Sequence, residues 1–171
     1  MRRLYGRALP GNRAQKITPT LRSKNINVIA TMTKNELLHY KVLDGSGNRQ
    51  RMFDFLVELI KLLENIQIHE ATIIMDNASF HHCEEIENLL IAAKHEVVFL
   101  PPYSPFFNAI EYVFSQWKSH VRSKEGNNIE DLKKNIQSFY GVITSKQCEN
   151  YYLHIVQNAH KCIAGDVLYD T

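Results

Sequence analysis

Two acidic residues, Asp76 and Glu111, have the surroundings expected of ligands for a hard divalent cation. Asp76 comes directly after the apolar run 72–75, which predicts a short buried strand that ends in a carboxylate. An acid at the carboxyl end of a parallel strand points into the crevice where α/β sheets bind ligands. Glu111 follows the proline-rich stretch 101–108 and stands in the first turn of a predicted helix. We therefore predict that the two carboxylates hold a cation between them.

Each of these residues also has an ordinary structural interpretation. Asp76 could form an Asx turn with Asn77. Residues Asn108 to Glu111 have the N-x-x-E pattern of a capping box, which needs no metal ion. Tyr103, which stands among prolines, could stack on a nucleotide or only pack its own loop. Each residue taken alone leaves both interpretations open.

The predicted helix over residues 109–124 combines an apolar side with a polar side. The apolar side, which we expect in the core, consists of Ile110, Val113, Phe114, Trp117 and Val121. The neighbouring side starts with Glu111 and continues at helical spacing through Ser115, Lys118 and Arg122. A carboxylate followed by two cations suits a surface that binds a metal ion and DNA phosphates. A solvated helix face would show the same pattern.

Histidine and cysteine residues do not indicate a zinc site. His81, His82 and Cys83 are adjacent, but zinc sites generally need four ligands at defined spacing, and nothing nearby completes the set. The remaining cysteines, Cys148 and Cys162, make the total three, without C-x-x-C spacing. We expect reduced thiols in an intracellular protein. No apolar run approaches the roughly 18 residues of a membrane span, so we expect no membrane contact.

The distribution of charge is uneven along the 171 residues. The first 35 residues contain eight basic residues and no acid, whereas the remainder has 12 basic and 18 acidic residues. A basic arm on an acidic body predicts contact with phosphates, with a solvated terminal segment as the alternative. The DNA-binding candidates in this arm are Arg7, Arg13, Arg22 and Lys24.

The order of predicted elements indicates an α/β domain. Residues 26–32 and 37–43 form β-branched runs around a short turn, which predicts an antiparallel hairpin. Further elements are a helix over 50–65, a strand over 72–75, a helix over 82–93, a strand over 97–100, and helices over 109–124, from about 128, and over 145–161. A short strand is also expected near residues 13–17. We find no linker that would divide residues 1–171 into two domains.

Two motifs together resemble the catalytic domain of DDE-type transposases of the mariner class. Residues 73–81, IIMDNASFH, match the family's strand-D-N-A-x-x-H pattern. Residues 100–111, LPPYSPFFNAIE, match its L-P-x-Y-S-P-x-x-N-P-I-E pattern, with Ala109 in place of the second proline. The 34 residues between Asp76 and Glu111 are an interval that the family uses. The likeness extends over about residues 3–124, which leaves residues 125–171 as a helical extension.

The resemblance implies an RNase H-like mixed sheet flanked by helices, with two Mg²⁺ (or Mn²⁺) ions bound by three acids. It implies cleavage and rejoining of DNA at transposon ends through two-metal chemistry. Asp76 and Glu111 would be the second and third of these acids. Asn77, His81, Tyr103 and Asn108 would line the site, while Lys118 and Arg122 would approach DNA.

The family's first acid lies on a central strand that precedes the region of residues 6–14. Only residues 1–5 stand before that region here, and they contain no acid and no apolar strand. Asp44, expected in a turn, and Asp54, expected on the first helix, are unsuitable replacements. We therefore expect the central strand to be missing, cation binding to be weakened, and the edges of the sheet to be left unpaired.

These expectations lead to two functional hypotheses. The first is a DDE catalytic domain that is inactive as this chain, because one of three acids is absent. The second is a non-enzymatic remnant that binds DNA or forms a homodimer. A nuclease with another acid in the empty position is a weaker third alternative. If the source is eukaryotic, we expect a nuclear protein.

Overall fold

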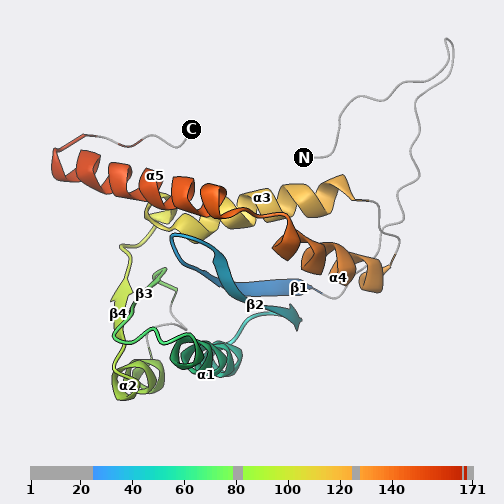
Figure 1. Ribbon diagram of the computed structural model, residues 1–171, viewed down its shortest axis with the longest axis horizontal. Helices are drawn as coiled ribbons and strands as arrows, with labels where there is room; N and C mark the ends of the chain where they lie inside the picture. Colours follow the sequence, from blue (N-terminus) through green and yellow to red (C-terminus); the bar gives the residue numbers. More distant parts are fainter. Residues whose placement is uncertain (1–24, 79–82, 125–127, 167, 169–171) are drawn as a thin grey trace, which may run out of the picture.

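The structure, a computed structural model, describes residues 25–78, 83–124, 128–166 and 168. The strands lie between two groups of helices (Figure 1). Helices α1 (Arg49–Asn65) and α2 (Glu84–Ala92) lie on one side. The other side has α3 (Ala109–Ser123), α4 (Ile129–Ser138) and α5 (Ser145–Ile163).

The first two strands form an antiparallel hairpin. β1 (Ile26–Met32) pairs with β2 (Leu37–Asp44), and Thr33 N donates to Glu36 O at 2.8 Å in the turn. Side chains alternate along β1, so that Val28 packs towards α3 while Ile29 packs towards α1. The hairpin therefore contributes apolar side chains to helices on both of its faces, although both strands also contain polar residues.

The other two strands are parallel and are connected by α2. β3 (Thr72–Met75) pairs with β4 (Glu96–Phe99). Ile73 and Val97 pack into the core beside α1 and α2, whereas their neighbours Ile74 and Val98 are 50% and 41% exposed. Within the described residues no strand joins β3 to the hairpin, so the sheet consists of two separate pairs.

Two apolar cores lie on opposite sides of the hairpin. The first lies beneath α1 and α2 and is centred on Phe55, Leu56, Leu59, Ile86 and Leu90. The second joins the hairpin to α3 and α4. Here Trp117 stacks on Phe139 at 4.8 Å and donates its indole N–H to the carbonyl of Ile136 at 2.9 Å. This bond satisfies the one polar group of a buried indole.

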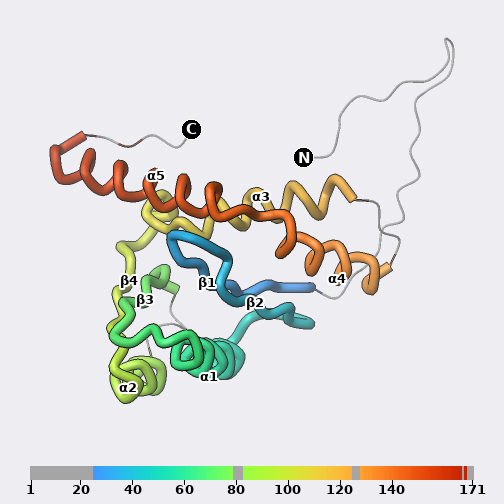
Figure 2. Tube along the Cα trace, in the orientation of Figure 1, coloured from blue at the N-terminus to red at the C-terminus, as the bar shows by residue number. Residues whose placement is uncertain are grey.

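The last helix packs along the outside of α3 (Figure 2). α5 begins with a complete capping box between Thr144 and Gln147. Its buried residues are Cys148 and Asn158. Burial raises the pKa of the Cys148 thiol, which stays protonated and acts as a small apolar side chain.

The predicted order of elements is confirmed, and the bounds agree within about two residues. One local prediction is wrong: Asp44 is the last residue of β2 and forms an ion pair with Lys133 of α4 at 2.8 Å, instead of lying in a turn. Asp54 lies on α1 as expected and accepts a hydrogen bond from Gln50. The expected short strand near residues 13–17 lies outside the described residues. In the part of the chain that the structure describes, no helix is both long and apolar enough to span a membrane.

Candidate active site

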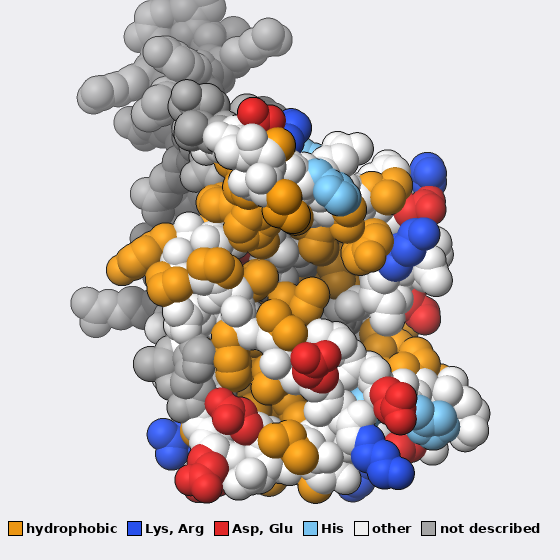
Figure 3. Space-filling view, turned by 90° about the vertical axis from the view of Figure 1, so that its left-hand side faces the viewer, with side chains coloured by type: hydrophobic (Ala, Val, Ile, Leu, Met, Phe, Trp, Pro, Cys, Tyr) orange, Lys and Arg blue, Asp and Glu red, His pale blue; other side chains and the backbone are white. Residues whose placement is uncertain are grey.

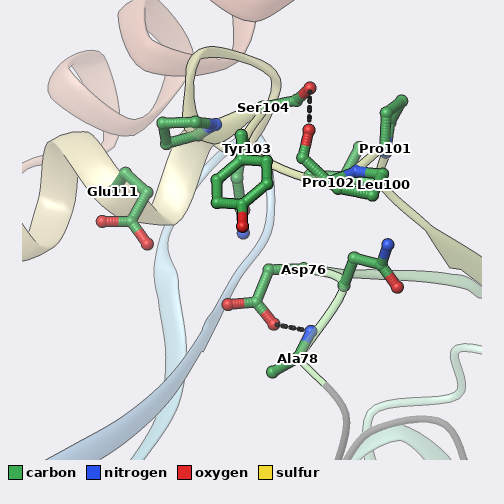
Figure 4. A pocket seen from close by; sticks show the side chains of 11 residues that line it. Asp76, Ala78, Leu100, Pro101, Pro102, Tyr103, Ser104 and Glu111 are labelled. Atoms are coloured by element: carbon green, nitrogen blue, oxygen red, sulfur yellow. Dashed lines mark hydrogen bonds between the residues drawn. The ribbon is translucent and has the colours of Figure 1, made fainter.

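A pocket of about 470 Å³ lies where β3 and β4 end and α3 begins. Asp76, Asn77, Tyr103, Asn108 and Glu111 all contribute to its lining, so the structure brings together five of the predicted site residues. Figure 4 shows the carboxylates of Asp76 and Glu111 turned towards the same space. Two acids that are distant in sequence therefore open into one cavity.

The position of Asp76 follows from the pairing of β3 with β4. Met75 is buried, and its carbonyl accepts a hydrogen bond from Leu100 N at 2.9 Å, one residue beyond the end of β4. Asp76 is the next residue and leaves the sheet at its carboxyl edge. Its Oδ1 accepts the backbone N–H of Ala78 at 3.3 Å (Figure 4). The Asx turn is therefore present, and it fixes the carboxylate at the pocket wall.

The loop from β4 to α3 is stiffened by prolines and by short-range hydrogen bonds. Pro101 and Pro102 offer no N–H to a strand ladder, which ends the β conformation. A 3₁₀ turn, η1 (Pro105–Phe107), follows with proline at its start. Asn108 N donates to Pro105 O at 2.9 Å and thereby connects this turn to α3.

Glu111 is not a capping residue. The side chain of Asn108 makes no capping hydrogen bond, and Glu111 N bonds to the backbone carbonyl of Asn108 at 3.1 Å. The capping-box interpretation of these two residues is therefore wrong. Among the described residues, no side chain is hydrogen-bonded or ion-paired to the Glu111 carboxylate, although this carboxylate lines the pocket. It is available to a ligand at the positive end of the α3 dipole.

Tyr103 does not pack its loop. The residue is 98% exposed, and its φ of 56° places a bulky residue in the left-handed region. Such a conformation costs about 1–2 kcal/mol for a non-glycine residue. The alternative in which Tyr103 only packs the loop is therefore wrong, and its ring is accessible at the edge of the pocket.

The charged side of α3 extends away from this pocket. Lys118 and Arg122 are exposed, as predicted, but they do not line the cavity. Val113 and Trp117 are buried on the neighbouring apolar side, which confirms the predicted amphipathic pattern. A ligand in the pocket would therefore contact the Lys118 and Arg122 side chains only if it were large enough to extend beyond the pocket.

The oxygen ligands of the pocket fit one hard cation better than two. Mg²⁺ is commonly bound by one or two carboxylates together with water and substrate phosphates, and Asp76 and Glu111 supply two carboxylates. Asn77 and Asn108, whose side chains carry amide oxygens, also line the pocket. Within the described residues, no group of three His, Cys, Asp or Glu side chains could hold a metal ion.

Several predicted site residues lie outside the described residues. These are His81, Arg7, Arg13, Arg22 and Lys24. Conversely, Ser104 lines the pocket and was missed from the sequence. Its hydroxyl donates to the carbonyl of Pro102 at 3.2 Å and closes the turn that holds Tyr103. The Ser-Pro dipeptide that follows Tyr103 was the available sequence signal.

Residues 1–133 match the family model described as DDE superfamily endonuclease. The fold is similar to that of the Mos1 transposase paired-end complex with left transposon end, with a TM-score of 0.79 at 19% identity over 96% of this chain and 51% of that chain. It is also similar to the crystal structure of the catalytic domain of Mos1 mariner transposase, with a TM-score of 0.73 at 18% identity over 84% of this chain and 75% of that chain. No curated protein matches the chain by sequence.

The chain spans about half the length of the Mos1 chain in the paired-end complex. The match to the family model covers more than three quarters of its residues and includes both motifs that line the pocket. The expected RNase H-like architecture, a sheet flanked by helices, is confirmed by the similarity to the Mos1 catalytic domain. The chain therefore belongs to the DDE superfamily endonuclease family.

Proposed function

We propose that the chain is a DDE transposase domain that binds a divalent cation and transposon-end DNA but does not cleave DNA by itself. The observation that supports this proposal is the convergence of Asp76 and Glu111 on one pocket, each held by its own element. Mos1 transposase forms a paired-end complex with the left transposon end, and its structures include complexes with Mg or Mn, which supports the same chemistry here.

The roles of the individual residues follow from their positions. Asp76 and Glu111 would bind Mg²⁺ or Mn²⁺, and Asn77 and Asn108 would orient its water or phosphate ligands. A bound cation in this class of site activates the attacking oxygen and stabilises the leaving one. Tyr103 would stack on an unpaired base, because its ring is exposed and base–aromatic stacking tolerates any sequence.

Two acids do not complete the three-acid site of the family, and this is the reason for proposing binding without cleavage. Two-metal catalysis requires both ions to be held on either side of the reacting phosphate. The described pocket supplies carboxylates for one ion. Magnesium-dependent cleavage of transposon-end DNA by this chain, abolished in Asp76→Asn, would contradict this part of the proposal.

Cation binding can be measured directly by titrating Mn²⁺ and following its electron paramagnetic resonance signal. Asp76→Asn and Glu111→Gln should each weaken Mn²⁺ binding about tenfold or more, since each removes a charged ligand. Asp54→Asn and Glu64→Gln make the same chemical changes on the exposed side of α1 and should leave binding unchanged. Equal Mn²⁺ affinity in all five proteins would refute the assignment of the site.

DNA binding is tested by filter binding across a salt series. Each phosphate contact that is lost should reduce the slope of log K against log salt concentration by about one. We expect this change for Lys118→Gln and for Arg122→Gln. Lys61→Gln is the control, because Lys61 is exposed on α1, on the other side of the strands. A slope that neither α3 variant alters would exclude this helix from the DNA interface.

A non-enzymatic role remains the second candidate, and the incomplete set of acids favours it. In that role the fold would bind DNA or form a homodimer without holding a cation. DNA binding that persists unchanged in Asp76→Asn and Glu111→Gln, together with no detectable Mn²⁺ binding, would support this candidate. Analytical ultracentrifugation would show whether the protein forms the predicted homodimer.

A further inference from the structure

The C-terminal helix α5 supplies no side chain to the pocket, yet it contacts the turn that leads into α3. The contact is specific. Asn158 is 7% exposed, and its Nδ2 donates to the backbone carbonyl of Phe106 at 3.1 Å. Phe106 is the middle residue of η1. A buried amide on α5 therefore bonds to the proline-rich loop 52 residues earlier in the chain.

Other residues on the same side of α5 contact α3 just beyond Glu111. Tyr151 Oη donates to Gln116 Oε1 at 2.8 Å, and its ring stacks on Tyr112 at 5.6 Å. His154 meets Tyr112 edge to face at 5.2 Å. Tyr151, His154 and Asn158 follow helical spacing, so one side of α5 contacts the chain both before and after Glu111.

The start of α3 depends on such support because its own cap is weak. Neither η1 nor α3 has a side-chain N-cap hydrogen bond. A missing cap typically costs about 1 kcal/mol and leaves the first turn free to fray. Backbone hydrogen bonds link Pro105 to Asn108 and Asn108 to Glu111. A shift of η1 would therefore be transmitted to the Glu111 carboxylate.

We propose that Asn158 is a positioning residue that fixes η1 and thereby sets the place of Glu111 in the pocket. Its effect on the loop is independent of ligand, whereas its effect on cation affinity rests on the proposed function. In this arrangement α5 carries no ligand of its own and acts through the backbone carbonyl of Phe106. The helical extension thus contributes to the site as well as to the core.

Hydrogen exchange in the metal-free protein tests the first part. Asn158→Asp has nearly the same shape as asparagine but loses the amide donor, and Asn158→Ala removes the whole amide. Either should speed exchange of the Phe107, Asn108 and Glu111 amides about five- to tenfold, the effect of losing one buried hydrogen bond. The amides of the β1–β2 hairpin should keep their exchange rates. Asn150→Asp makes the same charge change at an exposed position of α5 and is the matched control.

A measurement on the unaltered protein covers the case in which these variants fail to fold. The Nδ2 protons of Asn158 should exchange slowly and show nuclear Overhauser contacts to η1, whereas those of Asn150 should exchange rapidly. Absence of these contacts would overturn the proposal. So would unchanged exchange at Asn108 and Glu111 in a folded Asn158→Ala protein.

The Mn²⁺ titration separates this inference from the proposed function. Asn158→Ala should weaken Mn²⁺ binding about tenfold, as loss of a supporting residue commonly does, while Asn150→Asp should not. If the unaltered chain binds no Mn²⁺, the proposed function fails and the exchange data still decide the role of Asn158. Weaker binding accompanied by slow exchange at η1 would refute positioning as the cause.

Discussion

The residues that line the pocket differ in how they are held. Asp76 is held by the Ala78 amide, whereas Tyr103 is fully accessible and adopts a left-handed backbone conformation. A strained conformation persists only where its surroundings determine it, and such residues gather at functional sites. The hydrogen bond between the Ser104 hydroxyl and the Pro102 carbonyl closes the turn around Tyr103. The turn therefore holds the backbone of Tyr103 while its ring stays exposed to solvent.

Replacing Tyr103 by glycine should separate stability from binding. Glycine adopts positive φ without steric cost, so the substitution should remove about 1 kcal/mol of strain from the folded state. This gain should offset the destabilisation that comes from the greater conformational entropy of glycine in the unfolded chain. We expect a melting temperature equal to or above that of the unaltered protein. Affinity for single-stranded DNA should fall by about 1–3 kcal/mol, the usual value of one stacked base. Tyr103→Phe keeps the ring and should retain affinity; a loss of affinity there would point to the hydroxyl instead.

A titrating residue links β2 to α1. A hydrogen bond from Lys41 at 2.6 Å, with a smaller contribution from His39, lowers the pKa of Glu58 below its ordinary value of 4.5. A carboxylate with a lowered pKa stabilises the fold above the unfolded pKa and loses this effect as pH falls through the folded one. Because Glu58 is half exposed, the contribution should be below about 1 kcal/mol.

Glu58→Gln should therefore be slightly destabilising at pH 7, and the difference from the unaltered protein should diminish below about pH 4.5. Urea unfolding at several pH values measures this difference. Glu64→Gln, on the same helix and with no ion pair to another described residue, should show no such dependence. A destabilisation that grows on acidification would reverse the sign of the proposed interaction.

Elements are positioned by the side on which they are apolar. In α2, Ile86 is fully buried in the first core, whereas Ile91 is 66% exposed near the end of the helix. The two isoleucines thus provide a matched pair on one helix. Substituting each of them tests whether α2 is held to β3 and α1 mainly by the side that faces the first core. The same packing would hold the connection between the parallel strands β3 and β4 in place.

Ile86→Ala should lower the free energy of unfolding by about 2–5 kcal/mol, through lost burial and the cavity left behind. Ile91→Ala should change it by no more than about 0.5 kcal/mol. Chemical denaturation followed by circular dichroism gives both values. Similar effects of the two substitutions would mean that α2 is buried on both sides.

At the scale of the whole molecule, the hairpin joins the two cores. On β1, Ile29 packs against the first core and Val28 packs against the second. Unfolding of either core would therefore disturb this strand. The only tryptophan, Trp117, lies in the second core. Its fluorescence therefore reports on that core alone, while circular dichroism reports on all helices.

We expect Ile86→Ala, a change in the first core, to lower the unfolding midpoint seen by Trp117 fluorescence and by circular dichroism equally. Coincident transitions indicate a single cooperative unit. The unaltered protein and Ile91→Ala serve as references. A fluorescence transition that keeps its midpoint while the dichroism transition shifts would show that the two cores unfold separately.

The sequence predicted the elements well because the local patterns are strong. The β-branched runs of β1 and the apolar run of β3 agree with the observed bounds, and the apolar side of α3 lies in the core as expected. The convergence of Asp76 and Glu111 followed from two motifs at a familiar interval. Ordinary chemistry at a strand end and a helix start was enough to locate the pocket.

Features that depend on distant contacts could not be predicted. The N-x-x-E pattern at Asn108 suggested a cap, but η1 supplies the backbone bonds before Asn108 and the cap does not form. Asn158 was not singled out, because an asparagine on a helix shows nothing of a partner 52 residues away. Asp44 was expected in a turn, because the Asp-Gly pair favours turns, yet it is the last residue of β2.

The neighbouring residues Ile74 and Val98, exposed on one side of the parallel strands, have a practical consequence for handling the protein. Hydrophobic side chains gather across the face on which β4 and α2 lie (Figure 3). Such patches promote self-association in concentrated samples. Threonine at both positions retains β-branching while adding a hydroxyl, so Ile74→Thr with Val98→Thr should reduce light scattering at high concentration and yield a better sample for the titrations above.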